Sequence, residues 1–295
     1  MLRTVGTILT IAVFAAIGLV SPGSGQPKPL IVSTGDRDGT YVRFFSEIAR
    51  VCPQPPLQGM PSKGSLENLE RVVNNQANLG FVQSDVLFAK RLLEHDPSVE
   101  QARTFLVLYL EEIHILIPRY TTSIHVFSDL AGKRVGTYGG GSITSRNLFA
   151  MTKVHPASIQ DFAGPFDAIH ELLGDTVDAI IGVGGKPLPW VTALGPDYRL
   201  VPFNMYADVS KIYSPARLEY SNLGQVGQVE TIAVPSLLIT RDYKKPEITK
   251  PLLQLRGCIA KNLETLRQTV GNSPKWGQVN PTQKGPWPYF EGTSP

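Results

Sequence analysis

Three polar loops that contain glycine are the segments of this sequence best suited to chemistry: residues 34–41, 62–65 and 139–144. Each follows a predicted strand and precedes a predicted helix. The first turn of a helix leaves backbone N–H groups without helical partners, and the helix dipole adds partial positive charge there. Glycine lets a ligand approach that backbone closely, so such a loop can hold a carboxylate without a formal positive charge. A single glycine turn is more often structural, but three in successive units favour a shared ligand site.

Two further polar segments, residues 83–85 and residues 111–112, lie in or at the ends of predicted strands. Gln83-Ser84-Asp85 ends a predicted strand and either supplies a fourth set of polar contacts or caps the helix that follows. Glu111 and Glu112 are adjacent in a β-rich stretch, so on a strand they point to opposite faces and cannot act as an acid–base pair. We expect one of these two carboxylates to be solvated and the other to face the hinge of the fold.

Catalytic and cofactor motifs are missing from the sequence. It contains no Gly-x-Ser-x-Gly elbow, no His-Glu-x-x-His, no dinucleotide fingerprint and no phosphate loop. The five histidines lack the spacing of metal ligands. The net charge is only +3, and no basic stripe alternates with aromatic residues, which argues against a nucleic-acid partner. We therefore predict a protein that is not an enzyme and has no metal, cofactor or nucleic-acid partner.

The N-terminus has the order of a secretory signal. Arg3 supplies a positive charge, residues 8–20 form a short apolar run, and residues 21–25 are a small-residue, helix-breaking stretch. The apolar run is shorter than the ~20 residues that span a bilayer, although an uncleaved anchor is the alternative. We predict a signal peptide over residues 1–25, cleaved near Gly25, and export to the periplasm.

The sequence has two cysteines, Cys52 and Cys258. In an oxidising compartment such a pair readily forms a disulfide, and the alternative is two separate buried thiols. A bridge would close a loop of about 200 residues and stabilise the fold by ~4 kcal/mol in the chain-entropy model.

The pattern of short apolar runs and amphipathic segments predicts an α/β protein with two lobes. In the first lobe, strands are expected at 30–34, 57–60 and 77–82 and helices at 41–51, 66–74 and 86–93, with Ser65 as an N-cap. Residues 105–118 and 230–240 are β-rich and are interpreted as the two crossings between lobes. The second lobe is expected to contain strands at 134–137 and 177–183 and a helix at 143–151. A helix is predicted at 251–268, followed by an irregular tail from Gly271.

Several segments, in order, resemble the TAXI family, the extracytoplasmic solute-binding subunits of TRAP transporters. The similar segments are residues 33–41, 64–69, 77–85, 129–135, 141–144, 178–187 and 229–231. Each is weak alone, but together they cover nearly the whole chain after the predicted signal. The resemblance implies a type II periplasmic-binding fold with a two-strand hinge. It also implies a small carboxylate ligand, such as glutamate or glutamine, and delivery to a membrane permease driven by an ion gradient.

The resemblance also assigns lobes and ligand contacts. Lobe I is expected to comprise residues 26–113 and 234–295, and lobe II residues 114–233. The ligand contacts implied by the matching motifs are Gly39, Thr40, Tyr41, Gly64, Ser65, Gln83, Ser84, Ser142, Thr144 and Gly185.

The chain also departs from the family pattern. Asp36 and Asp38 replace glycines of the first loop, with Arg37 between them. Val42 stands where the family has a second aromatic residue, and Ile143 stands where the family often has glycine. Added carboxylates near a cleft would repel an anion unless Arg37 or Lys63 offsets them. The ligand could therefore carry an amine.

These observations predict a solute-binding protein that captures a small, carboxylate-bearing metabolite by hinge closure and delivers it to a TRAP-type transporter. A periplasmic module of the same fold that reports its ligand state to a membrane signalling protein is the first alternative. An enzyme built on this fold is the second, because a fold does not determine function.

Overall fold

The computed structural model describes residues 28–37 and 39–292. The predicted signal peptide and Asp38 therefore lie outside the described residues. Within the described part of the chain, none of the helices combines the length and the apolar character that a bilayer span requires.

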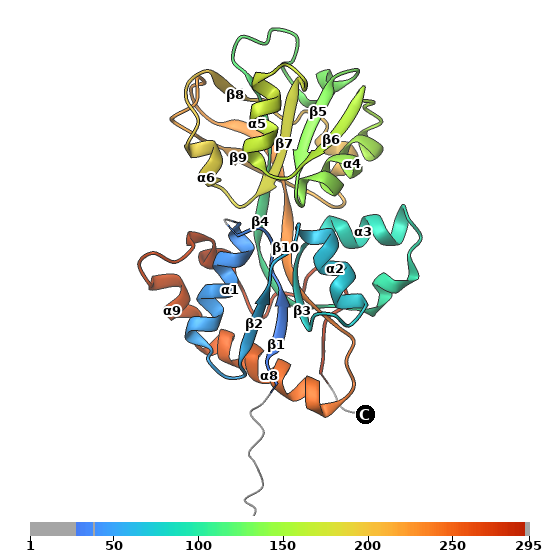
Figure 1. The fold of residues 1–295 in the computed structure, drawn as a ribbon, viewed down its shortest axis with the longest axis vertical. Helices are drawn as coiled ribbons and strands as arrows, with labels where there is room; N and C mark the ends of the chain where they lie inside the picture. Colours follow the sequence, from blue (N-terminus) through green and yellow to red (C-terminus); the bar gives the residue numbers. More distant parts are fainter. Residues whose placement is uncertain (1–27, 38, 293–295) are drawn as a thin grey trace, which may run out of the picture.

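Two lobes are joined by two long neighbouring strands, β4 (Ala102–Pro118) and β10 (Val229–Arg241), which run through both of them (Figure 1). The strands pair antiparallel with each other along much of their length. One end of β10 pairs with β3 of lobe I, and the other end pairs with β9 of lobe II. The strand order is β2-β1-β3-β10-β4-β7-β5-β6, with β8 beside β4 and β9 beside β10. This is the two-lobed α/β architecture with a two-strand hinge that the sequence predicts.

Lobe I contains parallel β-loop-α units closed by the C-terminal helices. Its strands are β1 (Leu30–Ser33), β2 (Leu57–Met60) and β3 (Leu79–Gln83), and its first helices are α1 (Thr40–Val51), α2 (Ser65–Val73), α3 (Ser84–Leu92) and η1 (Pro97–Gln101). After β10 follow α8 (Pro246–Lys261), α9 (Leu263–Gln268) and η3 (Pro274–Gln278). The strands form from short apolar runs, and β3 is buried at every position. Such burial on both faces is typical of strands covered by helices.

Lobe II is also built from parallel strands and helices. They are η2 (Phe127–Leu130), β5 (Arg134–Tyr138), α4 (Gly141–Thr152), β6 (Ser158–Phe162), α5 (Pro165–Leu173), β7 (Ala179–Gly184), α6 (Pro189–Thr192), β8 (Tyr198–Leu200), α7 (Tyr206–Val209) and β9 (Ser214–Leu218). β5 pairs parallel with both β6 and β7, and β7 pairs antiparallel with β4. The carboxyl ends of β5 and β7 therefore lead into the loops that face lobe I.

The disulfide predicted from the two cysteines is present. Cys52, which follows α1, is bonded to Cys258 in α8; their Cα atoms are 5.9 Å apart, and they are separated by 206 positions in the sequence. It ties the first helix of lobe I to the segment that returns after β10, beside a core that contains Phe44, Phe105 and Trp276.

The helix predicted over residues 251–268 is wrong in its bounds. The structure begins α8 at Pro246, where a proline is tolerated because the first helical N–H has no partner anyway. The helix then ends before Asn262, and α9 begins at Leu263. The side-chain amide of Asn262 donates to the carbonyl oxygen of Cys258 at 2.9 Å. Such local side-chain bonds compete with the helical ladder and favour a break.

Candidate ligand-binding site

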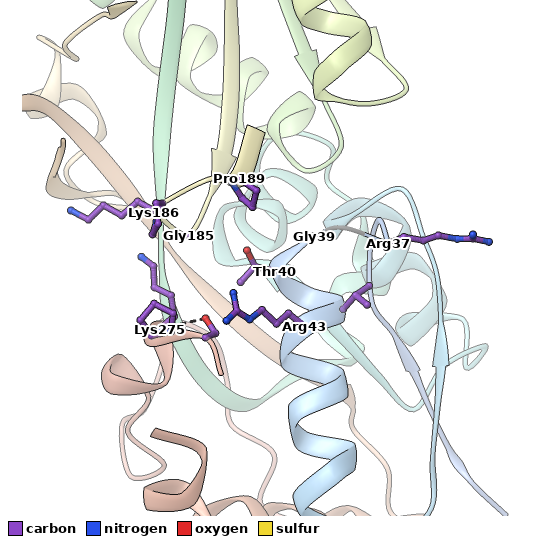
Figure 2. A pocket seen from close by; sticks show the side chains of 12 residues that line it. Arg37, Gly39, Thr40, Arg43, Gly185, Lys186, Pro189 and Lys275 are labelled. Carbon is purple, nitrogen blue, oxygen red and sulfur yellow. Dashed lines mark hydrogen bonds between the residues drawn. The ribbon is translucent and has the colours of Figure 1, made fainter. Parts of the chain in front are cut away.

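A cavity of about 250 Å³ lies between the lobes beside the start of α1 (Figure 2). Lobe I, lobe II and the C-terminal segment each contribute to its wall. The wall residues are Arg37, Gly39, Thr40, Val42 and Arg43; Gly185, Lys186, Pro187 and Pro189; and Ser273, Pro274 and Lys275.

The N-terminus of α1 forms one side of the cavity. Gly39 is the N-cap residue and provides no side-chain cap. The first N–H groups of the helix therefore lack both helical partners and a capping side chain. Figure 2 shows the Thr40 hydroxyl directed toward the space between the lobes. This end of α1 can bind an anion through backbone N–H groups, a hydroxyl and the positive end of the helix dipole.

Among the residues that the structure describes, which exclude Asp38, the wall of the cavity carries four cationic side chains and no carboxylate. In Figure 2, Arg43 and Lys275 face the cavity, whereas the charged ends of Arg37 and Lys186 extend away from it. Lys275 Nζ lies 2.9 Å from both carboxylate oxygens of Glu112, so part of its charge is already compensated. Arg43 is also paired, through Nε to Glu47 Oε1 at 3.2 Å, but its side chain is 48% exposed whereas that of Lys275 is 5% exposed, so Arg43 is the more accessible cation for a ligand carboxylate.

A buried carboxylate holds Arg43 and the C-terminal segment in place. Glu47 Oε1 accepts from Arg43 Nε at 3.2 Å and from the backbone N–H of Ser273 at 2.8 Å. Glu47 Oε2 accepts from the indole N–H of Trp276. Sequence analysis assigns no site residue to this segment, because the tail from Gly271 reads as irregular. The only local signal is a tryptophan in a polar segment, since a tryptophan in such a place is usually anchored by burial.

The structure places the sequence-predicted ligand contacts in three different surroundings. Gly39, Thr40 and Gly185 belong to the cavity wall. Ser142 lies outside the cavity, and its hydroxyl accepts from Arg146 in the next turn of α4. Tyr41, Ser65, Gln83, Ser84 and Thr144 are buried, and Gly64 is half-buried beside Gly140 of lobe II.

Ser65 is not the N-cap of α2 that the sequence predicts. Gly64 occupies the cap position with φ +119°, and Ser65 is the first helical residue. The Ser65 hydroxyl is instead used in a buried network: it donates to Gln83 Oε1 at 2.8 Å and accepts from the backbone N–H of Gln83 at 3.1 Å. The hydroxyl of Tyr41 lies 3.4 Å from it. The Ser65 hydroxyl is therefore bonded to Gln83, which is distant in sequence, and does not cap its own helix.

The glycine loops of the two lobes touch each other. A Cβ atom placed on Gly64 would lie 2.9 Å from the backbone nitrogen of Gly140, and one on Gly140 would meet the amide of Gln83. Only glycines fit at this approach, so the lobes are closed here. In this conformation the space that remains open between the lobes is the cavity beside the start of α1.

A second contact between the lobes is centred on Asp85, at the start of α3. Its Oδ2 accepts from the hydroxyls of Thr144 at 2.7 Å and Tyr213 at 2.8 Å, both in lobe II. Asp85 is fully buried, and burial raises its pKa. The neighbouring hydroxyl of Ser84 is buried without a partner among the residues described. Opening the lobes would break both hydroxyl bonds to Asp85.

Glu111 and Glu112 are both 3% exposed, so the expectation that one of them is solvated is wrong. They do point to different partners, as alternation along a strand requires. Glu111 accepts from the Gln83 side-chain amide at 2.8 Å, whereas Glu112 binds Lys275 and the backbone N–H of Lys186. Burial raises the pKa of Glu111 to about 7. Lys275 of the C-terminal segment covers Glu112, and Gln83 at the end of β3 contacts Glu111; strand patterning alone shows neither contact.

The carboxylate of Asp36 is not part of the cavity wall. Asp36 is exposed, and its Oδ1 accepts the backbone N–H of Arg37 at 2.7 Å. Asp36 therefore does not place a negative charge in the cavity.

Comparisons with known proteins give a family and a fold. Residues 33–292 match the NMT1-like family. The GluR0 ligand-binding core in complex with L-glutamate superposes with a TM-score of 0.52 at 12% identity, covering 82% of this chain and 96% of that one. A putative L-cystine ABC transporter protein from Listeria monocytogenes matches with a TM-score of 0.49 at 13% identity, covering 81% and 92%. The arginine-, lysine-, histidine-binding protein ArtJ from Geobacillus stearothermophilus matches with a TM-score of 0.49 at 15% identity, covering 85% and 99%. The fold is the type II periplasmic-binding fold.

Proposed function

Because the chain belongs to the NMT1-like family and has the two-lobed type II fold, we propose that it is an exported solute-binding protein. Its ligand is a small, carboxylate-bearing metabolite, an amino acid or an organic acid. The observation that carries this proposal is the cavity between the lobes, which is lined by the start of α1, Arg43 and Lys275. Binding, and not bond making or breaking, is the role that this set of groups supports.

Capture uses groups from both lobes. The ligand carboxylate binds to the first N–H groups of α1 and to the Arg43 guanidinium, a charge-assisted contact. The loop at Gly185–Pro189 then covers it from lobe II. The lobes open by bending of β4 and β10, and the ligand favours the closed state because only that state completes its contacts.

The partner that we propose is the permease of a TRAP-type transporter in a periplasmic setting. The support for it is the ordered resemblance of seven segments to the TAXI subunits and the signal-like N-terminus. Uptake of labelled ligand into cells that carry the permease should require this protein. Uptake that is unchanged after its deletion would contradict the transport role and favour the sensing alternative.

Ligand binding itself is tested with a thermal-shift screen of the mature protein against amino acids and small carboxylates. A ligand at a hundred times its dissociation constant should add about 2.7 kcal/mol of stability. Arg43→Ala should weaken binding by at least tenfold, because a charge-assisted contact is lost.

Arg50→Ala is the matched control. Arg50 lies two turns further along α1 and, like Arg43, bonds to the 271–272 segment, but it does not line the cavity. Its substitution should leave affinity unchanged. Equal losses in the two variants, or no stabilisation by any small carboxylate, would refute the assignment of the cavity.

A further inference from the structure

Lys275 and Glu112 form a buried ion pair that connects lobe I with the lobe II side of the hinge. Lys275 belongs to η3 of lobe I, where the next residue, Trp276, is stacked on Phe44 with ring centres 4.3 Å apart. Glu112 lies on β4 opposite Gly184 of β7, a strand of lobe II. The side chains of Lys275 and Glu112 are 5% and 4% exposed, and Lys275 Nζ lies 2.9 Å from the carboxylate. The pair therefore spans the boundary between the lobes.

The Lys275 ammonium group uses all of its donors on the hinge strand β4. It donates to both carboxylate oxygens of Glu112 and to the backbone carbonyl oxygen of Leu110, each at 2.9 Å, and a lysine ammonium has only three N–H groups. From the same segment, Gln278 Oε1 accepts the backbone N–H of Leu110 at 2.9 Å. The register of β4 against β10 shifts just beyond Pro235, the residue opposite Leu110. The C-terminal segment thus holds β4 beside an irregular point of the hinge.

Glu112 also holds the lobe II wall of the cavity. Its Oε2 accepts the backbone N–H of Lys186 at 2.8 Å. Gly185 and Lys186 follow β7 and line the cavity. Lys275 packs against the same loop, because a Cβ atom on Gly185 would lie 2.9 Å from Cε of Lys275. One carboxylate therefore receives a cation from lobe I and a backbone N–H from lobe II.

The far end of this loop has a separate anchor within lobe II. The backbone N–H of Leu188 donates to the Tyr220 hydroxyl at 2.9 Å, and that hydroxyl lies 2.9 Å from Nε2 of His114. His114 lies opposite Gly182 of β7, and Tyr220 belongs to a hydrophobic cluster of lobe II. This second anchor therefore does not depend on Lys275.

From these contacts we infer that Lys275 and Glu112 are positioning residues for the lobe II wall of the cavity. Lys275 orients the Glu112 carboxylate, and the carboxylate holds the Lys186 backbone N–H, so that Gly185 and Lys186 lie over the ligand site of lobe I. A buried carboxylate that loses its cation is left uncompensated, so removal of Lys275 draws Glu112 toward water and away from Lys186. This role rests on the proposed function, because it concerns how the cavity closes over a ligand.

The test is amide hydrogen exchange of the ligand-free mature protein, read at Lys186 and Leu188 by NMR. Lys275→Met should make exchange at Lys186 at least about tenfold faster, because the hydrogen bond of its N–H is lost. Exchange at Leu188 should stay within about twofold of wild type, because the Tyr220 anchor is intact. Tyr220→Phe should give the reverse pattern, with faster exchange at Leu188 and little change at Lys186.

Lys244→Met is the matched control. Lys244 also forms an ion pair in lobe I, with Asp242 at 2.8 Å, but its side chain is 65% exposed and its partner is not on the hinge. This variant should leave exchange at both Lys186 and Leu188 unchanged. Equal acceleration of Lys186 and Leu188 in Lys275→Met would show a general loss of stability, and no acceleration would show that Glu112 holds Lys186 without Lys275. Either result would overturn the inference.

The double variant Lys275→Met with Glu112→Leu separates positioning from stability. Removing one member of a buried ion pair is strongly destabilising, whereas replacing both by apolar groups is often close to neutral. The double variant should therefore melt near the wild-type temperature and still exchange rapidly at Lys186 alone. Protection of Lys186 equal to that of wild type would overturn the inference. Absence of stabilisation by any small carboxylate in the thermal-shift screen would instead overturn the proposed function, and this role in ligand binding with it.

Discussion

Replacing Glu111 with glutamine should change how the stability of the protein depends on pH. Burial raises the pKa of Glu111 from 4.5 to about 7. Between these two values the folded state binds more protons than the unfolded state, so stability falls as the pH rises. The contribution of Glu111 is therefore complete below about pH 4.5 and is lost as the pH rises through about 7. With 1.36 kcal/mol for each pKa unit, the loss between pH 5 and pH 8 is about 2.5 kcal/mol.

His114 titrates in the opposite direction, so the comparison must be a difference between two proteins. Burial lowers the pKa of His114 to about 3. Between that value and about 6.5 the unfolded state binds more protons, and stability rises with pH. This contribution is common to wild type and Glu111→Gln and cancels in the difference between them.

The assay is urea unfolding of both proteins at pH 5, 6, 7 and 8 with the disulfide intact. The stability of wild type minus that of Glu111→Gln should fall by about 2.5 kcal/mol from pH 5 to pH 8. Tyr109→Phe is the control, because it removes an unpartnered hydroxyl and keeps the carboxylate. Its pH dependence should run parallel to that of wild type. A wild-type to Glu111→Gln difference that stays constant over this range would refute the burial of Glu111.

Two further predictions concern contacts between the lobes. Asp85→Ala removes the carboxylate that accepts from both Thr144 and Tyr213, and it should destabilise the closed state by about 1–3 kcal/mol. X-ray scattering should then give a larger radius of gyration. Asp85→Asn keeps an acceptor oxygen, so this control variant should stay compact. An unchanged scattering curve for Asp85→Ala would show that this contact does not hold the lobes together. Gly64→Ala should also favour the open state, because its φ is +119° and the new Cβ would lie 2.9 Å from the Gly140 nitrogen. Gly132→Ala is the control, because φ is +71° at Gly132 and no other atom lies near the new Cβ. This variant has the backbone strain but no collision, so it should lower the melting temperature and leave the radius of gyration unchanged. The same scattering response in both glycine variants would argue against the close approach of the lobes.

Local signals account for what sequence analysis predicted well. The parallel units of lobe I follow from short apolar runs separated by glycine and proline, which act within a few residues. Strand β2 matches the predicted range, and the two crossings differ from β4 and β10 only in their end points. The disulfide followed from the number of cysteines and the expected compartment. None of these inferences needed contacts between distant parts of the chain.

The errors arise where a distant segment decides the outcome. Ser65 has the local character of a helix cap, but the side chain of Gln83 competes for its hydroxyl. Glu112 looks like an exposed strand residue until Lys275, 163 residues away, covers it. Arg43 looks like an ordinary surface arginine of an amphipathic helix, and only the cavity gives it a role.

The sequence by itself determined that this is a two-lobed α/β protein with glycine loops at strand–helix junctions, because periodicity and turn chemistry are encoded within short windows. Only the tertiary structure decided that the described part of the cavity wall is cationic, that the C-terminal segment forms one side of it, and that Glu111 is buried without a cationic partner among the described residues. Charge compensation and burial depend on which groups come within a few ångströms of one another. In this protein those groups come from segments that lie up to 229 residues apart in the chain, as Glu47 and Trp276 do.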